Sequence, residues 1–147
     1  MDYDSASTFA SGNPAVSSQL MIVNFEVSGE RYVNINRWGK YISIYEMNHS
    51  LQKIISLSSF PMNSSGAIGE FLYLTENLFN TDSKIEFMYI TNFGSADCYT
   101  YIYNENGTLI FSEPASPIIR SNVPLQQYPI YNTTYGTKMI LSYPNGH

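Results

Sequence analysis

Two stretches of the chain repeat one alternating pattern around a turn at the same position. Residues 41–51 read YISIYEMNHSL, residues 99–109 read YTYIYNENGTL, and five of the eleven positions are identical. In each stretch an alternating run leads to a turn around an asparagine and then to a second alternating run, which is typical of a β-hairpin. A hairpin used twice predicts a chain built from repeated β units.

The alternation begins at Leu20 and continues, with interruptions, to the end of the chain. Apolar side chains at Met21, Val23 and Phe25 alternate with their neighbours, which is the period of a strand. No segment carries a helical period over ten residues, since the nearest one, residues 66–80, has the centre FLYLT that favours a strand. The predicted strands are 20–27, 32–36, 41–46, 51–57, 68–74, 85–91, 98–103, 109–111 and 138–143, with short ones at 118–119 and 130–131.

Turn residues separate these strands at short intervals. Asn106-Gly107 is a strong hairpin signal, and we expect both residues at positive φ, as a two-residue hairpin turn of this kind requires. The four prolines between residues 114 and 129 interrupt any strand pairing there. His49 follows Asn48 in a turn and is expected to be exposed, with a left-handed φ.

The fold class that follows is all-β, with antiparallel meanders of about four strands each. The meanders pack either as a sandwich or as propeller-like blades. A chain of 147 residues fits a single β domain over 20–147, preceded by a polar arm or linker at 1–19. The repeat-like units are 20–58, 67–113 and a partial unit at 114–147.

Charge and cysteine content exclude several classes of function. Only seven residues are basic, the net charge is -5, and charged residues make up 13% of the chain. A nucleic-acid-binding protein needs a concentrated basic face, so we expect no nucleic-acid partner. No apolar run is long enough to cross a bilayer, so we expect no membrane insertion. The one cysteine, Cys98, is expected to be a small buried side chain.

No catalytic or metal-binding signature appears among the ionisable residues. Glu70, Glu86 and Asp97 are the carboxylates from which a glycoside-active enzyme would take a close pair, but solvated strand and turn positions are the favoured explanation for them. Neither His49 nor His147 has a nucleophile partner in a known motif. We therefore expect no enzyme, no catalytic residue, no metal site and no cofactor.

Aromatic side chains give the most distinctive surface signal. By alternation, three tyrosines share one face of strand 98–103, two share one face of strand 41–46, and a tryptophan lies in the turn before the latter strand. Such side chains stack on sugar rings or anchor a protein partner, and they also pack across strands inside a fold. The candidate binding residues are Trp38, Tyr41, Tyr45, Tyr99, Tyr101 and Tyr103.

Three segments carry a resemblance to a known family. These are NLFNTDSKIEFMY at 77–89, IYNENGTLI at 102–110 and YGTKMILSYPNG at 135–146. They resemble the β-rich repeat region that precedes the sorting domain in proteins of Bacteroidetes exported by the type IX secretion system. The resemblance covers roughly residues 20–147, without the sorting domain itself. It implies an extracellular or cell-surface location and no particular activity.

The function expected from the sequence is a non-catalytic extracellular or cell-surface β module that binds a glycan or another protein. The alternative is a structural subunit of a filament, shell or appendage, assembled as a homo-oligomer by strand exchange through the arm or the edge strands. A glycoside-active enzyme is the third hypothesis. The sequence does not choose between a sandwich and a propeller, nor does it name the ligand.

Overall fold

The computed structural model describes residues 18–77, 79, 82–117 and 130–144, and these residues form strands and turns without a helix. Two four-stranded antiparallel sheets dominate it. Sheet A consists of β1 (Ser18–Phe25), β2 (Gly29–Asn36), β3 (Tyr41–Tyr45) and β4 (Leu51–Ser56). Sheet B consists of β5 (Glu70–Thr75), β6 (Glu86–Thr91), β7 (Tyr99–Asn104) and β8 (Leu109–Glu113). In both sheets the strand order follows the chain, so the predicted all-β meanders of four strands are confirmed.

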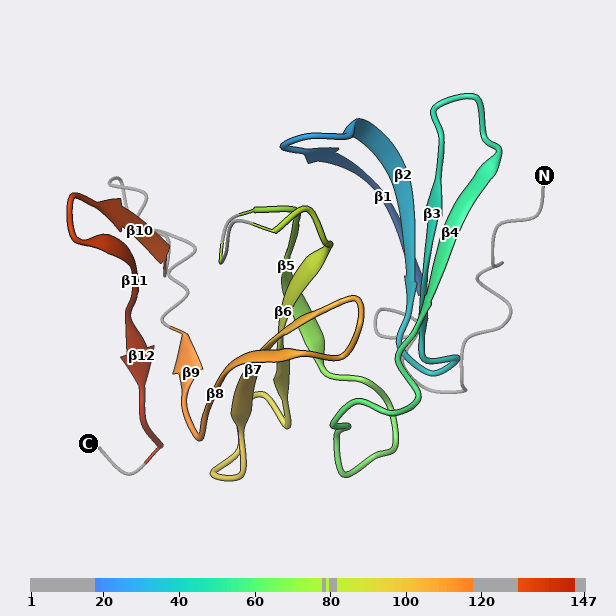
Figure 1. Cartoon of the computed structure of the whole chain (residues 1–147). Coiled ribbons are helices and arrows are strands. Elements are labelled where there is room, and N and C mark those ends of the chain that lie inside the picture. Colours follow the sequence, from blue (N-terminus) through green and yellow to red (C-terminus); the bar gives the residue numbers. More distant parts are fainter. Residues whose placement is uncertain (1–17, 78, 80–81, 118–129, 145–147) are drawn as a thin grey trace, which may run out of the picture.

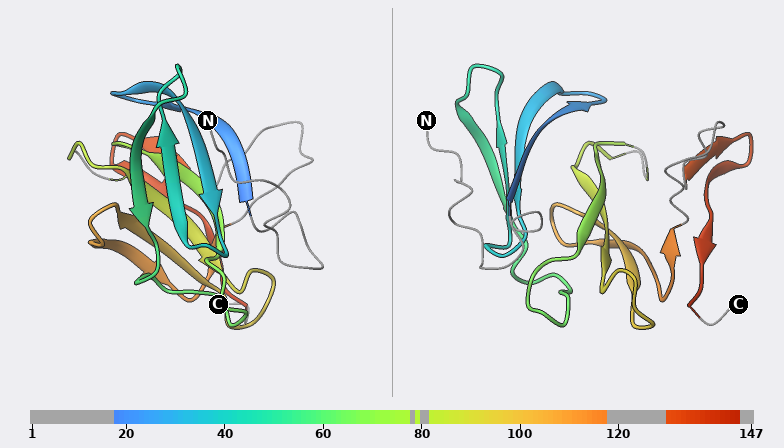
Figure 2. Two further views of the ribbon diagram at one scale, coloured as in Figure 1. Left: turned by 90° about the vertical axis from the view of Figure 1, so that its right-hand side faces the viewer. Right: turned by 180° about the vertical axis from the view of Figure 1, so that it is seen from behind.

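A third layer follows sheet B. It consists of β9 (Ser116–Pro117), β10 (Ile130–Thr133), β11 (Gly136–Met139) and β12 (Leu141–Ser142). Figure 1 shows sheet A, sheet B and this layer side by side, and Figure 2 shows the same succession from behind. No helix in the described ranges has the length and hydropathy to cross a bilayer.

Several predicted strand bounds need correction. The chain enters sheet A at Ser18, so the last two residues of the predicted arm belong to β1. The strand predicted at 138–143 is interrupted at Ile140, because β11 pairs with β10 whereas β12 pairs with β9. The strand predicted at 118–119 and the rest of the arm lie outside the described residues.

The repeated sequence stretches occupy equivalent places. Residues 41–51 lead from the third to the fourth strand of sheet A, and residues 99–109 do the same in sheet B. The two turns differ in detail, since His49 has a φ of 72° in the first and Gly107 has a φ of 85° in the second. The expectation that Asn106 also has positive φ is wrong. The loop is longer than a two-residue turn because the Asn104 N–H donates to the Thr108 carbonyl at 3.1 Å.

The hydrophobic core lies between the facing surfaces of sheets A and B. Alternation places the buried isoleucines of β3 on one face of sheet A, and Phe87 and Tyr89 of β6 meet this face. The buried members of this core are Phe25, Val33, Ile35, Ile42, Ile44, Ile55, Leu57, Phe60, Ile68, Ile85, Phe87 and Tyr89. Sheet A therefore packs on sheet B face to face, as in a sandwich.

Sheet B is covered on its other face as well. All six residues of β6 are buried, although their side chains point alternately to both faces. On the side away from sheet A, the Thr100 hydroxyl of β7 donates to the Ala115 carbonyl, just before β9, at 2.6 Å. A sheet covered on both faces is also what stacked blades require.

Candidate functional site

A pocket of about 400 Å³ lies at one end of sheets A and B. Three segments meet there: the turn between β2 and β3, the loop from β4 to β5, and the turn between β6 and β7. The first and the last of these are the equivalent turns of the two meanders, each joining the second strand to the third. The lining residues are Arg37, Trp38, Asn63, Ser64, Ser65, Ala67, Glu70, Ile90, Asn92 and Phe93.

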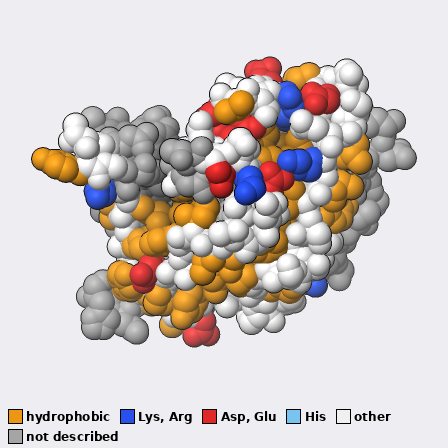
Figure 3. All heavy atoms as spheres, in the orientation of Figure 1, with side chains coloured by type: hydrophobic (Ala, Val, Ile, Leu, Met, Phe, Trp, Pro, Cys, Tyr) orange, Lys and Arg blue, Asp and Glu red, His pale blue; other side chains and the backbone are white. Residues whose placement is uncertain are grey.

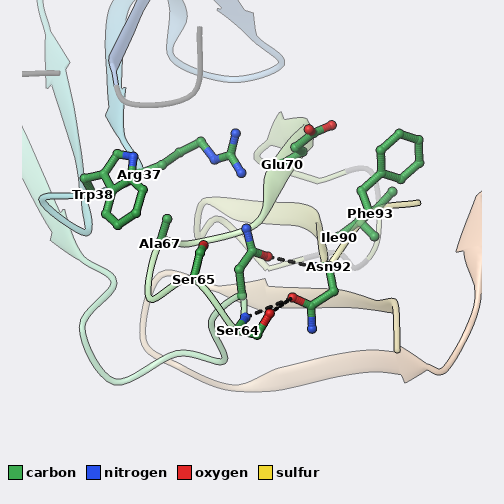
Figure 4. A pocket seen from close by; sticks show the side chains of 10 residues that line it. Arg37, Trp38, Ser64, Ser65, Ala67, Glu70, Ile90, Asn92 and Phe93 are labelled. Carbon is green, nitrogen blue, oxygen red and sulfur yellow. Dashed lines mark hydrogen bonds between the residues drawn. The ribbon is translucent and has the colours of Figure 1, made fainter. Parts of the chain in front are cut away.

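Two aromatic side chains of the pocket lining remain accessible to solvent. Trp38 is 37% exposed and Phe93 is 51% exposed. Each lies two residues beyond the end of the second strand of its sheet, and each is followed by a glycine. Figure 4 shows the two rings on opposite sides of the pocket, with Arg37 between them.

Two asparagines hold one wall of the pocket in place. Asn63 accepts a hydrogen bond from the Asn92 backbone N–H at 2.8 Å, and the Asn92 carboxamide oxygen accepts from the Ser64 N–H at 2.9 Å (Figure 4). The Ser64 hydroxyl donates to the same oxygen at 3.1 Å. Both carboxamide oxygens accept from backbone N–H groups, and no residue of the described ranges accepts from the amide NH₂ groups, so these can donate to a further partner.

Arg37 is fastened to the loop that precedes β5. Its Nε donates to the Ile68 carbonyl at 2.9 Å, and the Ile68 N–H donates to the Arg37 carbonyl at 3.0 Å. Burial lowers the pKa of the Arg37 guanidinium below its ordinary value, while the charge of Glu70 acts in the opposite direction. Figure 4 shows the guanidinium directed toward Glu70.

Glu70 begins β5 directly after a glycine packed against β6. A Cβ on Gly69 would lie 2.0 Å from the carbonyl oxygen of Ile90, so the backbone approaches more closely there than any other residue would allow. This contact fixes the start of β5, and with it the backbone position of Glu70.

The structure separates the tyrosines that the sequence analysis grouped. Tyr41 and Tyr45 lie on the face of sheet A opposite to the core isoleucines, and Tyr45 is buried. Tyr101 and Tyr103 pack against the core between the sheets, and their rings stack at 5.9 Å. Tyr99 continues this row and is 41% exposed. Of the six candidates, Trp38 alone lines the pocket, and the binding role of the tyrosines stays a prediction.

Two of the carboxylates considered for catalysis, Glu70 and Glu86, lie apart in the structure. Glu70 pairs with Ile90, which lies four residues along β6 from Glu86, or about 13 Å at the rise of a strand. Glu86 is fully buried and its Oε2 accepts from the Phe79 N–H at 2.9 Å, whereas Asp97 is exposed in the turn before β7. The described residues also hold no group of three His, Cys, Asp or Glu that could bind a metal ion. The pocket lining itself offers hydrogen-bonding, aromatic and charged side chains.

Sequence reasoning missed most of this site. Phe93-Gly94 follows β6 as Trp38-Gly39 follows β2, and this aromatic-glycine pair was the one available signal. Asn63 and Ser64 carry no signal of their own, since they come from the connecting loop.

Comparison with known proteins does not assign the site. The chain matches no protein-family model, no curated protein and no solved structure.

Proposed function

We propose that the chain is a non-catalytic binding module that holds a glycan in the pocket between Trp38 and Phe93. The single observation that carries the proposal is the combination of exposed aromatic rings with fixed polar side chains around one hollow. Aromatic faces stack on the apolar faces of sugar rings, and amide, hydroxyl and charged groups bind sugar hydroxyls. Charged residues make up 13% of the chain, and they are sparse over the lower part of the face in Figure 3, which favours binding without charge attraction.

The same proposal places the protein outside the cell or on its surface. A surface built largely from serine, asparagine, threonine and tyrosine, together with the resemblance to exported β-rich repeats, supports this location. The location does not enter the argument for the pocket.

Replacement of Trp38 tests the proposed function. In a glycan array with the purified protein, we expect at least one glycan to bind and Trp38→Ala to weaken it about tenfold, as removal of one stacking ring predicts. Trp38→Phe keeps a ring and should retain most of the binding. Tyr135→Ala is the matched control, because Tyr135 is 87% exposed and lies in the turn between β10 and β11, outside the pocket lining.

Equal binding by folded Trp38→Ala and wild type would place the glycan elsewhere and contradict this site. Absence of any glycan bound by the wild type would contradict the proposed function itself.

A structural role in a homo-oligomer is the second candidate, and the edge of sheet A favours it. β4 forms that edge within the described sheets and exposes Leu51 and Ile54 at 54% and 58%. An edge strand with exposed apolar side chains can accept a strand from another chain. Light scattering at high concentration tests this role, since a monomer throughout the concentration range would contradict it.

A further inference from the structure

The pocket contains two charged side chains of opposite sign that do not touch. Arg37 and Glu70 are the charged residues of its lining. The charge of Glu70 influences Arg37, yet within the described part of the chain no ion pair joins them. Both side chains therefore border the pocket without forming an ion pair with each other.

The surrounding backbone holds the Arg37 guanidinium and the start of the strand that carries Glu70. The Nε–Ile68 hydrogen bond orients the guanidinium, and among the described residues no hydrogen bond engages Nη1 or Nη2. Gly69 fixes the start of β5, where the Glu70 side chain is exposed. A guanidinium held by a hydrogen bond and an exposed carboxylate on a fixed backbone thus border the same pocket.

A neutral ligand satisfies both groups when it offers donors and acceptors close together. Neighbouring hydroxyl groups of a sugar do this, because a hydroxyl donates to a carboxylate and accepts from a guanidinium. A uronic acid or a sulfated sugar would bring negative charge close to Glu70. The protein's net charge of -5 also opposes a polyanion.

We propose that the pocket selects a neutral glycan, whose neighbouring hydroxyls donate to Glu70 and accept from Arg37. This inference rests on the proposed glycan-binding function and specifies its ligand class. It adds Glu70 and Arg37 to Trp38 as residues that contact the ligand.

Affinity electrophoresis in gels with neutral polysaccharides or with uronic-acid polymers tests the selection. We expect the wild type to be retarded by a neutral polysaccharide and not by polygalacturonate or alginate. Glu70→Gln keeps the size of the side chain and removes its charge, so neutral binding should weaken about tenfold. Glu30→Gln is the control for net charge, since Glu30 is exposed on β2 away from the pocket lining.

The possible results distinguish the selection of a neutral glycan from the glycan-binding function on which it rests. The selection would be supported if a neutral polysaccharide retarded the wild type, if Glu70→Gln weakened this retardation, and if Glu30→Gln left it unchanged. Preference of the wild type for a uronic-acid polymer would overturn the selection while the glycan-binding function stands. Equal weakening in both glutamine variants would overturn the role of Glu70. Binding of neither class by the folded wild type would overturn the function as well.

Discussion

At the scale of single residues, Gly69 shows how tightly one position can be constrained without any side chain. It precedes β5, where the chain from sheet A joins sheet B, and its Cα lies against the β6 backbone at Ile90. The neighbouring carbonyl belongs to a central strand and cannot shift without disturbing the pairing on both sides of β6. The same contact sets the position of Glu70, so the residue links stability to the pocket.

We expect Gly69→Ala to destabilise the fold by about 2–4 kcal/mol, because the new methyl group would meet backbone atoms. Gly29→Ala offers a matched comparison, since Gly29 has a φ of 75° but open space around it. Its cost should be about 1–2 kcal/mol from the left-handed backbone alone. Urea unfolding of both variants measures the two free energies. A Gly69 variant no less stable than the Gly29 variant would contradict the close approach.

At the scale of elements, reciprocal hydrogen bonds tie the β1–β2 turn to the end of β5. The Glu26 carboxylate accepts from the Glu76 backbone N–H at 2.8 Å. In return, the buried Glu76 carboxylate accepts from the backbone N–H groups of Val27 and Ser28, at 2.6 and 2.9 Å, and from the Ser28 hydroxyl. Each glutamate thus satisfies backbone donors of the other sheet.

This contact predicts a loss of stability in acid. Burial alone would raise the pKa of Glu76, but hydrogen bonds from Ser28 and Val27 and the charge of Arg31 together hold it below the ordinary value of 4.5. The carboxylate therefore stabilises the fold at neutral pH, and this contribution is lost as the pH falls below about 4.5 toward the lower folded pKa. Glu76→Gln should cost about 1–3 kcal/mol at neutral pH and lose less stability on acidification.

Denaturant unfolding at neutral and acidic pH gives the comparison directly. Glu30→Gln is the control, because Glu30 is an exposed glutamate and the same charge is removed. The same acid dependence in the wild type and in Glu76→Gln would rule out the proposed role of this carboxylate.

The elements also show where sequence reasoning succeeds and where it stops. Strands such as β3 and β7 were predictable because apolar and polar side chains alternate along each one, and alternation is a local property. The break at Ile140 was not, since it depends on which partner strand lies beside each half of the segment. In the pocket only Trp38 was predicted and Phe93-Gly94 repeats its pattern, whereas the contact of Asn63 with Asn92 depends on where the long loop from β4 to β5 folds.

At the scale of the whole molecule, sheets A and B present different faces to the core between them. The isoleucine face of β3 in sheet A is turned toward sheet B, and the tyrosine face of β7 in sheet B is turned back toward sheet A. Thr100, on the other face of β7, contacts the segment leading into the third layer. Tyr41 and Tyr45 of sheet A are therefore equivalent in position to the tyrosines of β7. In sheet B these tyrosines pack on another sheet. Packing between sheets is therefore the role of Tyr101 and Tyr103.

The tyrosine row between sheets A and B predicts a loss of stability in alkali. Tyr89 of β6 stacks on Tyr101 and Tyr103 of this row and is fully buried, and its hydroxyl donates to the Pro61 carbonyl at 3.0 Å. Burial, and then the nearby Tyr103 and Tyr101, raise the pKa of Tyr89 far above its ordinary value of 10.0. The neutral phenol is favoured in the fold, so its contribution is complete below pH 10 and declines as the pH rises further, when the unfolded chain can ionise.

Tyr89→Phe should therefore cost about 1 kcal/mol at neutral pH, from the lost hydrogen bond, and lose less stability than the wild type above pH 10. Urea unfolding from neutral to strongly alkaline pH measures both effects. Tyr135→Phe, at an exposed turn, should follow the wild type throughout. If Tyr89→Phe lost stability in alkali as steeply as the wild type, ionisation of Tyr89 would not be the cause of alkaline unfolding. The alkaline transition would then have to come from groups outside this row.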